Sequence, residues 1–290
     1  MSNDFQIILA ASLVSASCSL LGCFLVLRKM AMVGDAISHA VLPGIVVAFL
    51  ITGSRDSGAM LTGAVTIGIL TTFFIEFFHK KAKLQSDAAI GVTFTWLFAI
   101  GVILISVYAG KVDLDQDCVL YGEIAYVPLD LVFNKAGEVI APKAIIVSGS
   151  ILILVLGFVI VCYRRLFLTT FDPAYASAIG ISTVLWHYLL MGAVSVTTVA
   201  SFESVGAILV VALIVAPAAS AYLLTDDFKK MLALSVLIGI AASAGGYYLA
   251  ASIDGSIAGA IATVCGVIFL GAALISSAKK VSQKKAGKPA

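Results

Sequence analysis

The chain carries little charge for its length. Of its 290 residues only 12% are Asp, Glu, Lys or Arg, whereas 61% are hydrophobic, and the mean hydropathy is +1.11. Soluble domains contain about 25% charged residues, so this composition excludes a soluble globular protein. It also excludes a disordered chain and a nucleic-acid-binding protein with a basic surface, because both need far more polar residues. The chain is therefore expected to lie in a membrane.

Cysteine, histidine and catalytic motifs are also scarce. The five cysteines are scattered without a CxxC pair, which argues against a disulfide scaffold. The three histidines stand far apart, so a histidine-built catalytic zinc site is not expected. The chain has no GxxxxGK[ST] phosphate loop, no HExxH and no GxSxG motif. We therefore expect a protein that is not an enzyme and binds no permanent cofactor, and ATP would have to act on a partner chain.

Long apolar runs fill most of the sequence. A helix needs about twenty apolar residues to cross about 30 Å of hydrocarbon. Nine stretches meet this requirement, near 5–27, 32–53, 58–78, 88–109, 143–163, 182–200, 203–223, 231–251 and 257–277. The stretch 182–223 predicts either two helices that separate around 201–203 or one broken helix. The predicted fold is thus an all-α polytopic membrane protein with eight or nine transmembrane helices, forming a single domain over 1–290.

Basic residues gather on one side of the predicted membrane. If successive loops alternate sides, fourteen of the eighteen Lys and Arg residues share one side. This side should be the cytoplasm, which puts the amino terminus outside and the carboxyl terminus inside, with a basic cytoplasmic tail over 279–290. The connecting segment 110–142 would then be external. It carries six acidic residues and would attract cations.

Two ionisable residues lie one helical turn apart in the second predicted span. Asp35 and His39 belong to the string GDAISHAVLPG, and their spacing of four places both side chains on one helix face. Ionisable groups at membrane depth are costly, which makes the pair a functional candidate. The two side chains can share a divalent metal ion if other helices, water or a second subunit complete the shell. The alternative is a structural hydrogen bond between them or to a neighbouring helix.

Four further residues have predicted roles. Pro43 has no N–H for the carbonyl oxygen of His39, which leaves this oxygen free to face a cavity or an ion. Glu203 is expected at the start of a helix, either as a cap of the helix N-terminus or as another carboxylate on an ion path. His187 is expected to anchor a span at the membrane interface, and Glu76 to reach toward the cytoplasmic headgroups.

The predicted cytoplasmic segment 164–180 has room for a short helix. Asp172 is expected to cap this helix, Pro173 to be its first residue, and Gly180 to end it. Such an exposed helix needs a partner protein or the headgroup layer to cover it. It is expected to carry two aromatic side chains, Phe171 and Tyr175.

Three blocks of the sequence resemble the membrane-spanning permease subunits of ABC importers for manganese, zinc and iron. They are 33–45 (VGDAISHAVLPGI), 168–180 and 202–219 (FESVGAILVVALIVAPAA). Segments 87–93 and 119–127 are also similar to this family. The resemblance therefore covers nearly the whole chain.

The resemblance implies a fold similar to that of vitamin-B12-type importer permeases in a bacterial plasma membrane. Two permease chains, expected to be identical, would enclose a path between cytoplasmic ATPase subunits and an extracellular metal-binding lipoprotein. It also implies that Asp35 and His39 line this path and meet the metal. In the same way, 172–180 would be the coupling helix that fits the ATPase. Glu203 departs from the family pattern, in which an uncharged residue such as glutamine is expected.

We therefore predict the permease subunit of an ABC importer that moves a divalent transition-metal ion into the cytoplasm, with manganese first and zinc or iron next. A carboxylate with a neutral imidazole suits these ions better than calcium, which prefers oxygen ligands alone. One alternative is a proton-coupled secondary transporter in which Asp35 and Glu203 carry protons. The other is a permease of the same fold for a chelate such as haem or cobalamin.

Overall fold

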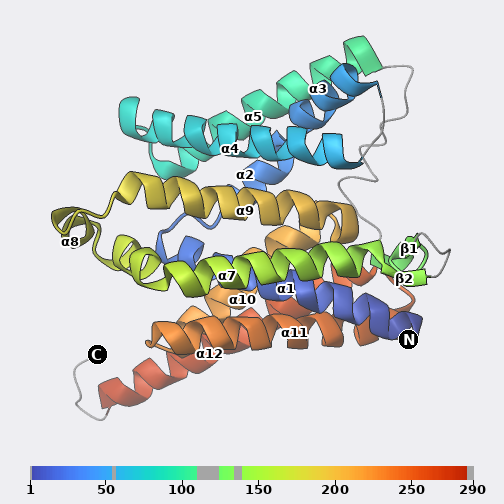
Figure 1. Ribbon diagram of the computed structural model, residues 1–290. Helices are drawn as coiled ribbons and strands as arrows, with labels where there is room; N and C mark the ends of the chain where they lie inside the picture. The colour runs from blue at the N-terminus through green and yellow to red at the C-terminus, as the bar shows by residue number, and fades with distance from the viewer. Residues whose placement is uncertain (1, 54–56, 110–123, 134–138, 286–290) are drawn as a thin grey trace. The chain divides into compact units, whose positions relative to one another are not determined.

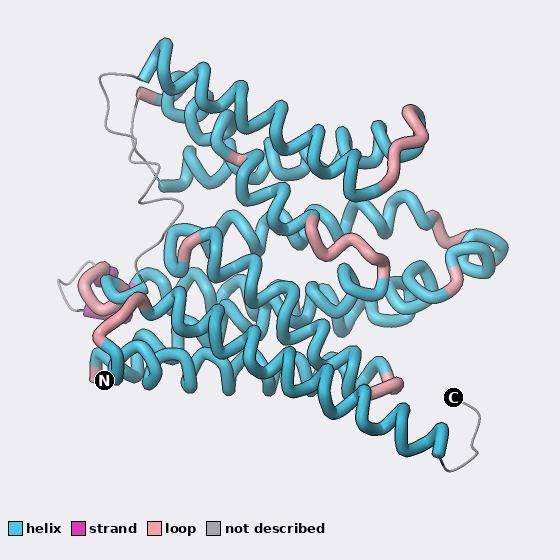
Figure 2. The backbone as a smooth tube through the Cα atoms, turned by 180° about the vertical axis from the view of Figure 1, so that it is seen from behind, coloured by secondary structure: helices cyan, strands magenta, loops and turns pink. Residues whose placement is uncertain are grey.

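The computed structural model describes residues 2–53, 57–109, 124–133 and 139–285, and these are almost entirely helical (Figures 1 and 2). Within them, nine helical stretches are long and apolar enough to cross a membrane. This confirms the predicted all-α polytopic fold. The helices are α1 (Asn3–Leu27), α2 (Val33–Ala40), α3 (Leu42–Thr52), α4 (Ser57–Lys81), α5 (Ser86–Leu104), α7 (Lys143–Phe171), α8 (Pro173–Ala178), α9 (Thr183–Val205), α10 (Ala207–Leu224), α11 (Phe228–Ile253) and α12 (Ile257–Lys285).

Helices dominate because a spanning segment must satisfy its backbone polar groups internally. The π-helical turn η1 (Ile105–Ala109) follows α5. The described strands lie between η1 and α7, where β1 (Leu131–Phe133) pairs antiparallel with β2 (Val139–Pro142) after the 3-10 turn η2 (Ile124–Tyr126). Much of the predicted external segment, 110–123 and 134–138, lies outside the described residues. That this acidic segment faces the outside of the cell therefore stays a prediction.

The described chain divides into two compact units. One contains Met1–Val26, Glu123–Ile153 and Ile208–Ala290, and the other contains Leu27–Gly122 and Leu154–Ala207. The two units alternate along the chain, so neither is a contiguous segment. This explains why the sequence offers no linker between them.

The first unit is built from most of α1, the first part of α7, and α10, α11 and α12. α11 and α12 lie side by side (Figure 1). The helix backbones of this unit approach each other most closely at small residues, as is typical of helix packing in membranes. A Cβ atom on Gly22 would stand 1.9 Å from the carbonyl oxygen of Ile214. α1 and α10 therefore cross at a point where only glycine fits.

The second unit contains α2 to α5, the last part of α7, α8 and α9. Its hairpin of α3 and α4 closes at a pair of glycines, where a Cβ on Gly44 or on Gly63 would lie 2.4 Å from the other residue's carbonyl oxygen. α5 packs on α2 and α3, and α4 packs on α9. This unit holds Asp35, His39 and the short helix α8.

The structure has two helices in the stretch 182–223, which was one of the two predicted alternatives, but the break between α9 and α10 lies at Gly206 and its predicted position around 201–203 was wrong. Gly206 has φ 79° and ψ 159°, a backbone conformation that is essentially restricted to glycine. α9 continues through Glu203 to Val205. The expectation that Glu203 starts a helix was therefore wrong, since the residue lies in the last turn of α9. A glycine conformation, and not a charged residue, sets this boundary.

Candidate functional site

α2 presents Asp35 and His39 on one face, as their spacing predicts. His39 Nε2 lies 3.6 Å from Asp35 Oδ1, and the two side chains are 38% and 31% exposed. The buried residues of the same helix are mainly apolar, namely Val33, Gly34, Ala36, Ile37, Ser38 and Ala40. These residues pack against the rest of the unit and fix the position of α2. The side chains of Asp35 and His39 lie on the other face of the helix and stay partly exposed.

The helix that carries this pair is interrupted directly after it. α2 ends at Ala40 and α3 begins at Leu42, with Pro43 in its first turn. The Val41 N–H donates to the Ile37 carbonyl, and the N–H groups of Gly44 and Ile45 both donate to the Val41 carbonyl. Pro43 has no N–H to continue the helical hydrogen bonds at this point, which is a physical reason for the interruption. Half-helix ends inside a span are typical of sites where transporters bind ions.

Two aromatic side chains from α5 flank His39. Its ring centroid lies 5.8 Å from that of Phe94 and 6.0 Å from that of Phe98, the latter edge to face. Sequence reasoning did not identify these phenylalanines, although their spacing of four residues puts both on one helix face. Centroid distances of this size are typical of aromatic contacts, so α5 contributes an apolar surface beside the imidazole.

Within the described residues, no third His, Cys, Asp or Glu joins Asp35 and His39. The side chain of Glu203, the third predicted ligand, lies outside the described part of the structure. The pair by itself supplies one carboxylate and one imidazole. A transition-metal shell needs further donors, which backbone carbonyls, Glu203, water or another polypeptide would have to supply.

The short helix α8 follows the sequence prediction closely. The Tyr175 N–H donates to Asp172 Oδ1 at 2.9 Å, Pro173 is the first residue of the helix, and Gly180 has φ +83°. α8 lies at the turn from α7 to α9 (Figure 1). The Tyr175 side chain is 54% exposed, so this helix offers an aromatic residue to solvent or to a partner.

One part of the predicted segment 164–180 was wrong. The residues from Arg164 to Phe171 belong to the end of α7, which is longer than the apolar run that predicts it. Phe171 is therefore the last residue of α7 and does not lie on the short helix. Its ring centroid lies 4.6 Å from that of Phe167, with the two rings tilted by 37°, and Phe171 is 50% exposed. It still adjoins Tyr175 at the same turn of the chain.

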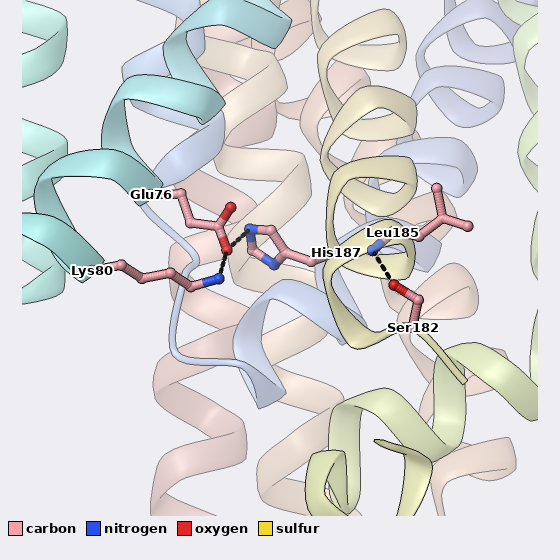
Figure 3. A network of polar contacts seen from close by, with 5 residues as sticks. All are labelled: Glu76, Lys80, Ser182, Leu185 and His187. Atoms are coloured by element: carbon pink, nitrogen blue, oxygen red, sulfur yellow. Dashed lines mark hydrogen bonds and ion pairs between the residues drawn. The ribbon is translucent and has the colours of Figure 1, made fainter. Parts of the chain in front are cut away.

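A second acid–imidazole contact joins α4 to α9 (Figure 3). Glu76 Oε1 lies 2.5 Å from Lys80 Nζ and 3.8 Å from His187 Nε2. Glu76 is only 8% exposed. The prediction that Glu76 reaches outward to the headgroups was therefore wrong, and the interfacial position of His187 stays a prediction. The two residues are distant in sequence, and only the packing of α4 on α9 brings them together.

Comparisons with known proteins agree with this architecture. MntD, a manganese transport system membrane protein of Bacillus subtilis, is 51% identical over 285 residues, which cover 98% of this chain and 96% of the relative. TroD, a zinc transport system membrane protein of Treponema pallidum, is 44% identical over 264 residues, which cover 91% of this chain and 71% of the relative.

A solved structure and a family match extend the comparison. PsaBC from Streptococcus pneumoniae, solved in complex with a Fab, has a TM-score of 0.74 at 31% identity, covering 92% of this chain and 89% of that one. The ABC 3 transport family matches residues 3–276. With nine candidate spans among its described residues, an interrupted second span and a short helix between α7 and α9, the chain belongs to the ABC 3 transport family.

Proposed function

We propose that this chain is the permease subunit of an ABC importer that carries a divalent transition-metal ion into the bacterial cytoplasm, with manganese as the first choice. The observation that carries this proposal is the pair of Asp35 and His39 beside a helix interruption. Relatives named as manganese transport proteins, and one named as a zinc transport protein, support the choice of ions. The ion is the substrate and not a resident cofactor.

The geometry of the pair suits a transient metal site. Bonds from a transition metal to carboxylate oxygen or imidazole nitrogen are about 2.0–2.2 Å long. Two such bonds together exceed the 3.6 Å between His39 Nε2 and Asp35 Oδ1, so one ion can contact both atoms. An ion held by two protein donors, with water or other chains completing the shell, also leaves easily, which conduction requires. Glu203 stays a predicted further carboxylate on this path.

α8 is the proposed contact with the ATPase. Asp172 caps the helix, Gly180 ends it, and Tyr175 is exposed on it beside Phe171. The basic residues predict that this end of the molecule faces the cytoplasm. We infer that ATP hydrolysis on partner subunits acts through α8, that two permease chains form the path, and that an extracellular lipoprotein delivers the ion.

Metal accumulation in cells tests the ion site. Variants Asp35→Asn and His39→Ala should lose manganese accumulation by about tenfold or more, because the first replaces the carboxylate by a neutral amide and the second removes the imidazole. Matched controls are Asp87→Asn and His79→Ala, which make the same changes at exposed positions of α5 and α4. All variants are first checked for membrane insertion and for co-purification with the ATPase. Normal accumulation of manganese, zinc and iron in both site variants would overturn the proposed site.

The same cells separate the rival functions. An ATPase partner inactivated in its phosphate loop should stop accumulation, because the permease has no nucleotide site of its own. Accumulation that continues without the ATPase and follows the proton gradient would support the secondary transporter. Uptake of haem or cobalamin, with no response to free metal ions, would support the chelate importer.

A further inference from the structure

Arg28 connects the segment before α2 to the end of α7. Its Nε–H group donates to Thr170 Oγ1 and an Nη2–H group donates to Thr169 Oγ1, both at 3.0 Å. The Thr169 hydroxyl donates to the Arg165 carbonyl at 2.9 Å, which leaves its oxygen to accept from the guanidinium. Thr169 is 6% exposed. The planar fork of Arg28 therefore holds two successive hydroxyls in a fixed geometry.

The two ends of this contact lead to the two parts of the proposed mechanism. Thr170 lies directly before Phe171 and Asp172, where α7 gives way to α8. Arg28 begins the short connection 28–32 that enters α2, and α2 carries Asp35. If the junction of α7 and α8 moves, Arg28 can therefore move with it and shift the start of α2, which carries the proposed ion site.

The surroundings of Arg28 suit a contact that persists through a transport cycle. Burial lowers the pKa of the Arg28 guanidinium to about 10, so the group stays charged at neutral pH. Its described hydrogen-bond partners are neutral hydroxyls. Desolvating a guanidinium is costly unless the geometry uses its donors. Such a partly buried contact should persist longer than a surface ion pair, which contributes little to stability and breaks readily in water.

Other contacts hold α9, the helix that follows α8. The Arg165 guanidinium lies 5.4 Å from the centre of the Trp186 ring, which connects α7 to α9. Glu76 approaches His187 across α4 and α9. These contacts brace the two helices on either side of α8 against each other and against α4. Arg28 differs from them because its own chain segment leads directly into α2.

We propose that Arg28 is a positioning residue that transmits movement of α8 to the Asp35 and His39 pair. The ATPase moves α8 and the end of α7, Thr169 and Thr170 carry Arg28 with them, and the connection 28–32 shifts α2. Arg28 does not contact the transported ion. This inference rests on the proposed function, because it takes α8 as the coupling helix and the pair as the ion site.

The test measures transport and ATP hydrolysis in the same preparation. The permease is reconstituted in proteoliposomes with its ATPase and its metal-binding protein, and Mn²⁺ uptake is divided by ATP hydrolysed. Arg28→Lys keeps the charge but loses the fork, and the double variant Thr169→Val with Thr170→Val removes both acceptors at nearly constant shape. Both should lower the ions moved per ATP by about fivefold or more, the scale of a typical coupling between sites, while ATP hydrolysis continues.

A matched control replaces two exposed threonines on α4, Thr62→Val with Thr66→Val, whose hydroxyls donate to carbonyl oxygens of their own helix. The control should keep the wild-type ratio. An unchanged ratio in both test variants would overturn the inference. A parallel fall of uptake and hydrolysis at constant ratio would also overturn it, because a merely structural contact lowers both together. If the Arg28→Lys permease does not assemble with the ATPase, the double variant Thr169→Val with Thr170→Val alone tests the inference.

The same preparation separates this inference from the proposed function. Wild-type protein that hydrolyses ATP without moving Mn²⁺, or an Asp35→Asn variant that moves it normally, contradicts the proposed function. Normal wild-type transport that Asp35→Asn abolishes, with a wild-type ratio in the Arg28 and threonine variants, contradicts only the role of Arg28.

Discussion

At the scale of single residues, the second unit contains two acid–imidazole contacts with different environments. Asp35 and His39 have side chains that are 31% and 38% exposed. Glu76 and His187 have side chains that are 10% and 15% exposed, and Lys80 already lies against the same carboxylate oxygen. The first pair is partly exposed, whereas the Lys80 ammonium group already contacts the second. The difference favours the proposed ion site in α2 and a structural contact between α4 and α9.

This difference predicts the behaviour of a Glu76→Gln variant. Removing the carboxylate leaves the mostly buried His187 and the more exposed Lys80 without the negative group that both contact, which should destabilise the protein by about 1–3 kcal/mol. The measurement is thermal unfolding of the purified protein in detergent, with Asp87→Asn as the control. Metal uptake per folded molecule should stay near the wild-type level. Lost uptake with unchanged stability would instead put Glu76 on the ion path.

The two pairs also show which contacts the sequence can predict. Asp35 and His39 are one turn apart on one helix, so their proximity follows from helix geometry alone. Glu76 and His187 meet only because α4 packs on α9, and nothing in the local sequence of either residue specifies that packing. The contact of Arg28 with Thr169 and Thr170 was missed for the same reason.

At the scale of helices, boundaries follow backbone chemistry more closely than charge. The cap of α8 was predicted correctly, because Asp172, Pro173 and Gly180 each act within one turn of the chain. The break between α9 and α10 was misplaced, because Glu203 resembles a loop residue while Gly206 lies in an apolar run. A glycine that needs a positive φ cannot be told from a packing glycine by its neighbours alone.

Gly206 gives a prediction at this scale. Gly206→Ala should destabilise the protein by about 1–3 kcal/mol, because an L-residue with a side chain is strained at φ 79° and ψ 159°. Gly266→Ala in α12 is the control, since a Cβ there meets nothing within 4 Å. Both variants are compared by thermal unfolding in the same detergent. Equal stability of the two variants would show that the break tolerates an ordinary residue.

At the scale of the whole molecule, hydropathy predicted most of the architecture. Nine candidate spans are present among the described residues, because a segment that crosses a bilayer must be long, apolar and helical regardless of its neighbours. The two compact units could not be predicted. Their segments alternate along the chain, and contacts of that kind depend on small residues such as Gly22 and Gly44 meeting distant backbone.

Orientation across the membrane is the remaining property of the whole chain that the sequence predicts. Fourteen basic residues on one side against four on the other should hold the loop at α8 in the cytoplasm and the loop at η2 outside. In a background without the native cysteines, Tyr126→Cys, at a residue 57% exposed, should react with a membrane-impermeant maleimide on intact cells. Tyr175→Cys should react only after the cells are opened, and its labelling on intact cells would reverse the orientation. Because α8 must face the ATPase to be driven by it, a reversed orientation would remove the proposed coupling route through Arg28 along with the direction of import.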